Sequence, residues 1–215
     1  MIHRLQFSSE AEWLQHRDRI GGSECSAIIG MNPYMTNIEL WQIKTGRIQP
    51  EDISDKPYVR YGHQAEPLLR ELFKLDFPEY RVEYYPNNMI LNEEMPWAHA
   101  SLDGELVDPD GRRGILEIKT TNILQSMQRE KWNDGIPNNY YCQILHYLMV
   151  TGYTFVILKA QLKSEWQGEI RISTKHYKIE RKDVEDDINY LRRMERDFWD
   201  CVQRDRRPDL ILPEI

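Results

Sequence analysis

Two segments in the middle of the chain alternate between apolar and polar residues, as β-strands with two different faces do. The segment 97–107 places polar side chains on one face, namely Ser101, Asp103 and Glu105. Its other face is apolar and carries Ala98, Ala100, Leu102 and Leu106. In the segment 114–120, Glu117 and Lys119 share one face, and Leu116 and Ile118 are predicted to point inward. The intervening residues are rich in Asp, Pro and Gly, which favour turns. The pattern therefore predicts a hairpin that brings Asp103, Glu117 and Lys119 together.

Signals for helix starts recur in the N-terminal part of the chain. Residues 9–12 and 36–39 each form a capping box. The first predicts a short helix through about Arg17, and the second predicts a helix that Gly46 stops. Ser23 is predicted to cap a helical turn between them. The segment from about residue 9 to 46 is therefore predicted to be helical.

Apolar residues recur at helical spacing in three later segments. In 62–76 the predicted buried stripe comprises Ala65, Leu68, Leu69, Leu72 and Phe73. Pro67 fits that helix only if the helix begins just before it or kinks there. The segment 140–150, closed by Gly152, is predicted to be a second helix, and 182–206 a long amphipathic one.

Further strands are predicted at 81–91, 154–162 and 168–180, with a polar turn at 164–167 between the last two. Together with the hairpin they make a mixed sheet flanked by helices, so the predicted fold class is α/β or α+β. No internal repeat or Pro/Gly/Ser linker interrupts the chain. Residues 1–215 are therefore predicted to form a single domain with its core at about 58–180.

Composition narrows the possible classes of protein. The net charge of −7 argues against nonspecific coating of nucleic acid, although it allows an enzyme with a local basic groove. The three cysteines form no CxxC pair, which argues against a zinc ribbon or a disulfide scaffold. The sequence contains no membrane-spanning apolar run and no signal-peptide core. It therefore predicts a soluble, cytoplasmic protein.

The predicted hairpin combines two carboxylates with one ammonium group. Mg²⁺ prefers oxygen ligands and is usually held by one or two carboxylates together with water and substrate phosphate oxygens. Asp103 and Glu117 meet that requirement, and Lys119 supplies a cation that can orient water or offset charge on a phosphate. The alternative is an ordinary cross-strand salt bridge on a solvated face, worth about 0.2–1 kcal/mol.

Further motifs surround this hairpin in the order that a known nuclease family shows. They are 19–24 (Arg-Ile-Gly-Gly-Ser-Glu), 61–66 (Tyr-Gly-His-Gln-Ala-Glu), and 140–143 with Tyr147 and 150–152. From about Trp13 to Gln161, the sequence resembles the PD-(D/E)XK nuclease superfamily and, within it, the lambda-exonuclease-like, YqaJ-type viral recombinases. The resemblance implies a restriction-endonuclease-like core.

The resemblance also implies roles for individual residues around a metal site. Asp103 and Glu117 match the family's metal ligands, aided by the backbone carbonyl of Ile118, and Lys119 matches the catalytic lysine. Glu66 matches an acidic residue that acts on the metal through water; the alternative is an exposed helix carboxylate. Gln143 matches a glutamine close to the active site; the alternative is a polar side chain on a helix face.

Arg19, Ser23 and Ser101 match positions that receive the 5′-phosphate of a DNA end in lambda-type enzymes. For Arg19 and Ser23 the alternative is surface charge and helix capping. The sequence departs from the lambda pattern after Lys119, where it lacks an arginine. Arg129, further along on a predicted helix, is a candidate substitute, and this departure puts strict dependence on a 5′-phosphate in doubt.

The activity implied is a Mg²⁺-dependent exonuclease, with Mn²⁺ as a substitute, that degrades double-stranded DNA ends 5′ to 3′. The 3′ overhangs would serve a single-strand annealing protein in phage-type recombination, and family members form trimeric rings. Two alternatives remain open at this point. One is an endonuclease or a Cas4/RecB-like nuclease, although iron–sulfur members need four clustered cysteines. The other is a non-catalytic DNA-binding adaptor with the same fold.

Overall fold

The computed structural model describes residues 1–123, 126–133 and 135–213. Its larger sheet has five strands in the order β2-β5-β6-β7-β8. Their bounds are Arg81–Glu83, Gly104–Val107, Arg113–Ile123, Phe155–Trp166 and Glu169–Glu180. A smaller sheet has three strands in the order β1-β3-β4. These span Ile2–Gln6, Asn88–Asn92 and His99–Ala100.

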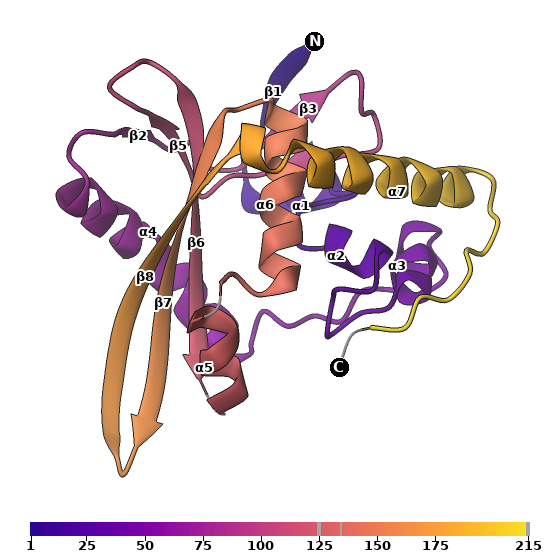
Figure 1. The fold of residues 1–215 in the computed structure, drawn as a ribbon. Coiled ribbons are helices and arrows are strands. Elements are labelled where there is room, and N and C mark those ends of the chain that lie inside the picture. Colours follow the sequence, from indigo (N-terminus) through magenta and orange to yellow (C-terminus); the bar gives the residue numbers. More distant parts are fainter. Residues whose placement is uncertain (124–125, 134, 214–215) are drawn as a thin grey trace.

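Strands β6 and β7 are parallel, whereas the other neighbours in the larger sheet are antiparallel. Parallel neighbours need a crossover connection. Two helices supply it here, α5 (Ser126–Asn133) and α6 (Asn138–Thr151). The larger sheet is therefore mixed, as the sequence predicted, and the crossover places α6 against it (Figure 1).

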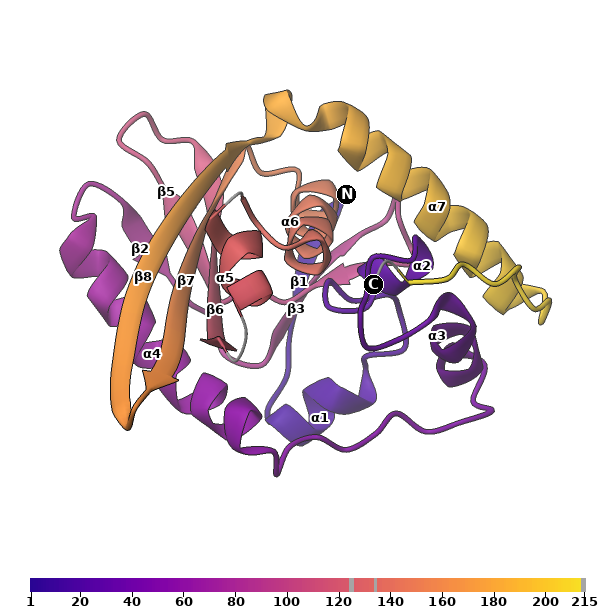
Figure 2. The ribbon, with the colours of Figure 1, turned by 60° about the horizontal axis from the view of Figure 1, so that its bottom comes forward.

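Helices cover both faces of the larger sheet. Helix α4 (Pro57–Asp76) packs its buried residues against Leu116 and Ile118 of β6. Ile115, which points the other way, lies in a second cluster with residues of α6. Figure 2 shows α4 and α6 on opposite sides of the strands. Because both faces are covered, the side chains of Glu117 and Lys119 lie under a helix layer and not on a solvated sheet face.

The remaining helices pack beside α6 and the smaller sheet. They are α1 (Glu10–Gln15), α2 (Cys25–Ile28), α3 (Asn37–Lys44) and α7 (Glu185–Gln203), with a short 3₁₀ helix, η1 (Arg181–Asp183), before α7. The buried stripe of α7 joins the same core cluster as α6. Among the described residues, no helix combines the length and apolar character needed to cross a membrane.

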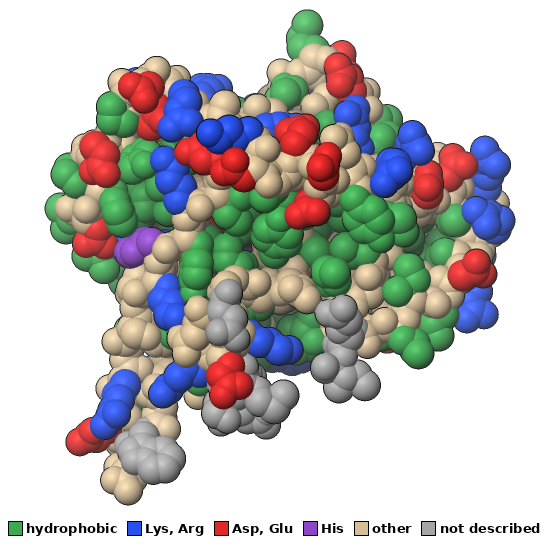
Figure 3. Space-filling model, viewed as in Figure 1, with side chains coloured by type: hydrophobic (Ala, Val, Ile, Leu, Met, Phe, Trp, Pro, Cys, Tyr) green, Lys and Arg blue, Asp and Glu red, His purple; other side chains and the backbone are tan. Residues whose placement is uncertain are grey.

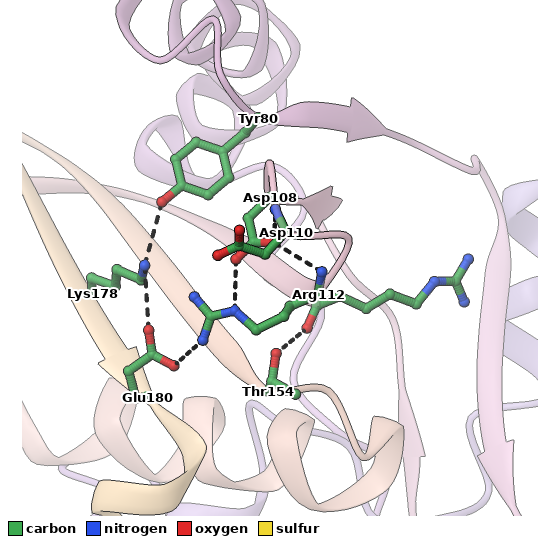
Figure 4. Close-up of polar contacts among 8 residues, drawn as sticks. Tyr80, Asp108, Asp110, Arg112, Thr154, Lys178 and Glu180 are labelled. Atoms are coloured by element: carbon green, nitrogen blue, oxygen red, sulfur yellow. Dashed lines mark hydrogen bonds and ion pairs between the residues drawn. The ribbon is translucent and has the colours of Figure 1, made fainter.

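The turn between β5 and β6 fixes the register of the central hairpin (Figure 4). Asp108 Oδ1 accepts hydrogen bonds from the backbone N–H groups of Asp110 and Arg112, at 3.1 and 2.8 Å. Gly111 adopts a φ of +79°, which glycine tolerates best. The Arg112 guanidinium contacts both Asp108 and Glu180, tying the turn to β8. The predicted turn chemistry is therefore confirmed.

Several locally encoded helix ends are confirmed. The Ser9 side chain caps α1 by accepting from the backbone N–H of Glu12. Residues 36–39 form a complete capping box at α3. Helix α6 ends at Gly152 with a φ of +67°. Ser23, however, is not a helix cap: α2 begins after Glu24 without a side-chain cap hydrogen bond.

The helix predicted at 62–76 begins earlier, at Pro57, so Pro67 lies in its interior. The predicted buried stripe was also too wide, because Leu68 and Leu72 are exposed while Leu69 and Phe73 are buried. A helix that lies on a sheet buries one narrow face, and apolar residues at the margins of that face can remain in solvent.

Three strand predictions were wrong in detail. The segment 81–91 divides into β2 and β3, which belong to different sheets. The segment 97–107 likewise divides into β4 and β5, and Asp103 lies in the short link between them. The β7–β8 turn lies at 167–168, where both residues have positive φ, and not at 164–167. Strand β1 was not predicted.

Candidate active site

The central hairpin brings Asp103, Glu117 and Lys119 together. Gly104 pairs with Leu116, so the next position places Asp103 across from Glu117. Asp103 Oδ2 accepts a hydrogen bond from the backbone N–H of Ile118 at 2.8 Å. Lys119 Nζ lies 2.7 Å from Glu117 Oε1. The three charged residues therefore form one cluster at the junction of the two sheets.

Glu117 is only 1% exposed. Although Lys119 forms an ion pair with it, neither carboxylate oxygen accepts a hydrogen bond with normal geometry from the described residues. Burial and the charge of Asp103 raise the pKa of Glu117 to about 8. Burial also raises the pKa of Asp103, although Lys119 and the Ile118 N–H oppose that rise. Carboxylates in this state lack part of the positive charge that would stabilise their ionised forms.

Lys119 compensates part of this negative charge. Burial tends to lower the pKa of its ammonium, but Glu117 and Asp103 together raise it above the ordinary lysine value. The ammonium also lies 5.3 Å from the centroid of the Tyr140 ring. In the metal-free site Lys119 is therefore a cation at neutral pH.

A cavity of about 500 Å³ opens beside this cluster. Its lining includes five residues predicted from the sequence, namely Ser23, Glu66, Ser101, Asp103 and Gln143. Glu117 and Lys119 do not line it; Glu117 is buried and the Lys119 side chain is 20% exposed. Arg19 and Arg129 are also absent from its lining.

Glu66 faces this cavity from α4. Burial and the charge of Asp103 raise the pKa of its carboxyl group to about 7. Arg70, one turn later on the helix, forms an ion pair with Glu66. Glu66 is therefore not the exposed, solvated helix carboxylate that was the alternative reading of this position.

Ser101 and Ser23 line the same cavity but differ in hydrogen bonding and exposure. The Ser101 hydroxyl donates to the carbonyl of Asn88 at 3.0 Å and accepts from Trp13 Nε1 at 3.1 Å. It retains acceptor capacity only, because its single proton is already used. The Ser23 side chain is exposed. Of these two hydroxyls, Ser23 is thus better placed to donate to an anion.

Arg17, not Arg19, is the arginine of the N-terminal segment that lines the cavity. Ile20 is fully buried and its backbone bridges to Ala98, which fixes the path of the chain here. The Arg19 carbonyl accepts a hydrogen bond from Lys44 Nζ at 2.7 Å. The sequence identified the right segment, but the placement of each side chain depends on this non-local bridge.

Gln143 and Tyr147 close one side of the cavity from α6. Gln143 is 6% exposed and donates to the Tyr147 hydroxyl at 2.9 Å. Gly22 packs directly against both: a Cβ there would lie 2.5 Å from the Tyr147 ring and 3.0 Å from Gln143 Cγ. Only glycine permits this approach of the loop to α6.

Arg129 lies away from the cavity. Its guanidinium donates to Ser164 Oγ at 3.2 Å, which links α5 to β7. Helix α5 follows the end of β6, so Arg129 lies near β7 of the β7–β8 hairpin and not near Asp103. The predicted substitute for the missing phosphate contact is therefore not positioned at the cavity.

Arg70, Tyr84 and His99 are among the cavity residues to which the sequence prediction gave no role. The spacing of Glu66 and Arg70, four residues apart on a predicted helix, was a usable signal for an ion pair. Tyr84 and His99 gave no local signal, because they reach the cavity only through the pairing of strands from two sheets.

The chemistry of the acidic side chains suits a hard divalent cation. Asp103, Glu117 and Glu66 offer carboxylate oxygens, and Glu117 Oε2 has no hydrogen-bond donor among the described residues, while Oε1 lies 2.7 Å from Lys119 Nζ. Burial raises the pKa of all three acids, and the charge of Asp103 adds to the rise for Glu66 and Glu117, so added positive charge would stabilise their ionised forms. A cation such as Mg²⁺, which prefers carboxylates and water, would supply that charge.

The mixed sheet with helices on both faces, and the Asp103, Glu117 and Lys119 cluster where it meets the smaller sheet, define a PD-(D/E)XK-type fold. The chain belongs to the YqaJ-like viral recombinase family, whose sequence model matches residues 12–154. It is 30% identical over 198 residues to "Uncharacterized protein YqaJ" of Bacillus subtilis (strain 168). That alignment covers 89% of this chain and 56% of the relative, so the chain spans little more than half of the relative's length.

Solved structures share the fold at low sequence identity. An alkaline exonuclease from Laribacter hongkongensis matches with a TM-score of 0.63 and 17% identity, covering 91% of this chain and 93% of that one. The same enzyme in complex with dAMP matches with a TM-score of 0.63 and 15% identity, covering 92% and 94%. A phage-related exonuclease from Haemophilus somnus 129PT matches with a TM-score of 0.54 and 12% identity, covering 87% and 96%.

Proposed function

We propose that this protein is a Mg²⁺-dependent exonuclease that degrades one strand of double-stranded DNA ends from 5′ to 3′. The observation that carries the proposal is the meeting of Asp103, Glu117 and Lys119 beside a cavity, with Glu117 buried and its only close cation being Lys119 among the described residues. Membership of a viral recombinase family and structural likeness to exonucleases support it. The 3′ overhangs would be used by a single-strand annealing protein in phage-type recombination.

Each residue then has a defined task. Asp103 and Glu117 would hold the cation together with the carbonyl of Ile118, and Glu66 would act through a water molecule. Mg²⁺, when bound, supplies a Lewis acid that activates water and offsets charge on the scissile phosphate. Lys119 stabilises the negative charge that develops on that phosphate. Ser23 and Arg17 offer donors to a terminal phosphate at the cavity.

Assembly and cofactor choice belong to the same proposal. By family likeness the protein would form a trimeric ring around DNA, and Mn²⁺ would replace Mg²⁺. Since Ser101 has no proton to give and Arg129 lies elsewhere, we expect a 5′-phosphate to accelerate degradation without being strictly required. Comparison of 5′-phosphorylated and 5′-hydroxyl ends measures this preference.

The test uses linear duplex DNA labelled at either the 5′ or the 3′ end, and closed circular duplex DNA, which has no ends. We expect wild-type protein with Mg²⁺ to consume linear DNA from the 5′ end, and Lys119→Ala and chelator to abolish this. Lys182→Ala, at an exposed lysine before α7, is the matched control and should retain wild-type activity. Cleavage of circles would indicate an endonuclease, and absence of any degradation would indicate a non-catalytic DNA-binding protein.

A further inference from the structure

Arg70 lies where three segments meet beside the cavity. Its side chain is 7% exposed, and Nη2 contacts the Glu66 carboxylate one turn earlier on α4. Its Nε donates to the backbone carbonyl of Asp103 at 2.6 Å. Its Cζ lies 3.5 Å from the centroid of the Tyr84 ring, between β2 and β3. One planar cation thus contacts a helix, the link before β5 and an aromatic ring.

The geometry of these contacts depends on the guanidinium group. Nε and Nη2 form one edge of a rigid plane, so the two oxygens that they contact are held at a fixed separation. The Tyr84 ring restrains the plane itself. A lysine ammonium is a point charge on a flexible stem and would not fix both acceptors. The contacts therefore require the shape of arginine as well as its charge.

We propose that Arg70 is a positioning residue that holds the backbone of Asp103 against the carboxylate of Glu66 and so sets the spacing of the cation-binding oxygens. This inference rests on the proposed function, because the spacing matters only if the site binds a divalent cation. Arg70 also gives a physical reason for Glu66 to act through water, since one carboxylate oxygen is already engaged by the guanidinium.

The test compares Arg70→Lys and Arg70→Gln with wild-type protein. Loss of an outer-shell partner typically costs 10–100-fold in metal affinity or activity. We therefore expect the Mg²⁺ dissociation constant, measured by calorimetry without DNA, to rise by roughly 10-fold or more. We expect kcat to fall by a similar factor and the KM for DNA to stay within about 2-fold, because Arg70 does not bind the substrate.

Lys74→Gln is the matched control. Lys74 lies on the same helix and forms an exposed ion pair with Glu71, so its loss should leave Mg²⁺ affinity and kcat unchanged. If Arg70→Gln fails to fold because Glu66 is left without its partner, the Mg²⁺ affinity of Arg70→Lys tests the inference. The double variant Glu66→Gln/Arg70→Met removes both charges and is the second check, with weak Mg²⁺ binding expected.

Three results would overturn the inference. Wild-type Mg²⁺ affinity in folded Arg70→Lys would show that the paired contacts of Nε and Nη2 are not needed. A raised KM for DNA with unchanged Mg²⁺ affinity would make Arg70 a phosphate contact. A lowered melting temperature alone would make its role structural. Wild-type protein that binds Mg²⁺ but leaves DNA intact would instead defeat the proposed function, while calorimetry would still decide the role of Arg70.

Discussion

At the scale of single residues, the site is short of positive charge. Three carboxylates, Glu66, Asp103 and Glu117, influence one another's ionisation, and Lys119 and Arg70 oppose them with two cations. Arg70 is already engaged by Glu66 and the Asp103 carbonyl. The remaining imbalance falls on Asp103 and Glu117, which is where a divalent cation would contribute most.

The first prediction concerns the stability of metal-free protein against pH. The pKa of Glu117 rises from an ordinary 4.5 to about 8 in the folded state, so the folded protein keeps its proton longer than the unfolded chain. Unfolding then releases a proton between these values, and stability should fall as pH rises through that window and level off above it. The slope contributed by Glu117 is at most about 1.4 kcal/mol per pH unit. Denaturant titrations with chelator at pH 5, 6.5 and 8 measure this.

Glu117→Gln should flatten this pH dependence and be more stable than wild type at pH 8 without metal. Mg²⁺ should raise the melting temperature of wild type at pH 8, but not that of Glu117→Gln, because the cation binds the ionised carboxylate. Glu71→Gln, at an exposed carboxylate, is the control. Parallel stability curves for wild type and Glu117→Gln would contradict the assignment of the slope to this residue.

The sequence predicted the central site residues because their signal is local. Strand alternation and an Asp/Gly turn suffice to predict the β5–β6 hairpin, in which Asp103 directly precedes the residue paired with Leu116 and so lies across from Glu117. The roles of Arg17 and Arg70 could not be predicted in the same way. Arg17 lines the cavity because Ile20 pairs with Ala98, and Arg70 is buried because a tyrosine from another segment stacks on it.

At the scale of elements, the approach of the 19–24 loop to α6 shapes one wall of the cavity. We predict that Gly22→Ala displaces Gln143 and Tyr147, because the added Cβ would overlap the Tyr147 ring. Overpacking of this kind typically costs about 1–3 kcal/mol. Exonuclease activity should fall in parallel. Gly135→Ala is the control, since nothing lies within 4 Å of a Cβ there. Unchanged activity and stability in Gly22→Ala would show that the cavity does not depend on the close packing of Gly22 against Gln143 and Tyr147.

The second element-scale feature is a buried pair between α6 and α7. His146 Nδ1 lies 2.7 Å from Glu195 Oε1, and Nε2 lies 2.8 Å from the carbonyl of His99, to which it must donate. The ligand atoms of Cys25, His146 and Glu195 lie within 4.8 Å of one another, which is close enough to consider a metal site. However, 2.7 Å is a hydrogen-bond separation, shorter than the roughly 3.3 Å between two ligands on tetrahedral zinc. The pair therefore shares a proton and joins α6, α7 and β4.

His146→Ala should destabilise the protein by about 3–5 kcal/mol, because it leaves a buried carboxylate without its partner. Denaturant unfolding measures this. The control is Asp197→Asn, on the exposed side of α7, for which a change below about 0.5 kcal/mol is expected. A small effect of His146→Ala would mean that Glu195 finds another donor or is protonated without cost.

Helices and strands were predicted correctly where the signal lies within the segment itself, and incorrectly where it depends on contacts with distant segments. The capping box of α3 and the terminal glycine of α6 lie within the segments that they define. Strand β1 and the division of 81–91 into β2 and β3 depend on pairing between distant segments. Strand β7 was predicted to end at Leu162 and not at Trp166, because the polar residues 163–165 do not continue the apolar alternation, whereas β8 was predicted to within one residue.

At the scale of the whole molecule, the proposed function requires an acidic protein to bind a polyanion. The net charge is −7, yet Lys and Arg side chains lie along the β7–β8 hairpin and beside α5 in Figure 3. Lys163 extends over the Tyr61 ring at 5.2 Å, and Arg171 is exposed on β8. Because β6 carries Lys119 and continues into this region beside β7, DNA that leaves the cavity along β6 would meet these cations.

The last prediction tests this path through salt dependence. Each phosphate contact contributes about 0.9 to the slope of log affinity against log salt concentration. Lys163→Gln/Arg171→Gln should therefore reduce the slope for duplex DNA by about 2 and weaken binding at low salt, with kcat at saturating DNA unchanged. Lys182→Gln/Arg193→Gln, near the start of α7 and on it, is the charge-matched control and should keep the wild-type slope. Equal slopes in both double variants would place the DNA elsewhere, because removing two cations changes the net charge identically and only contact with phosphate distinguishes them.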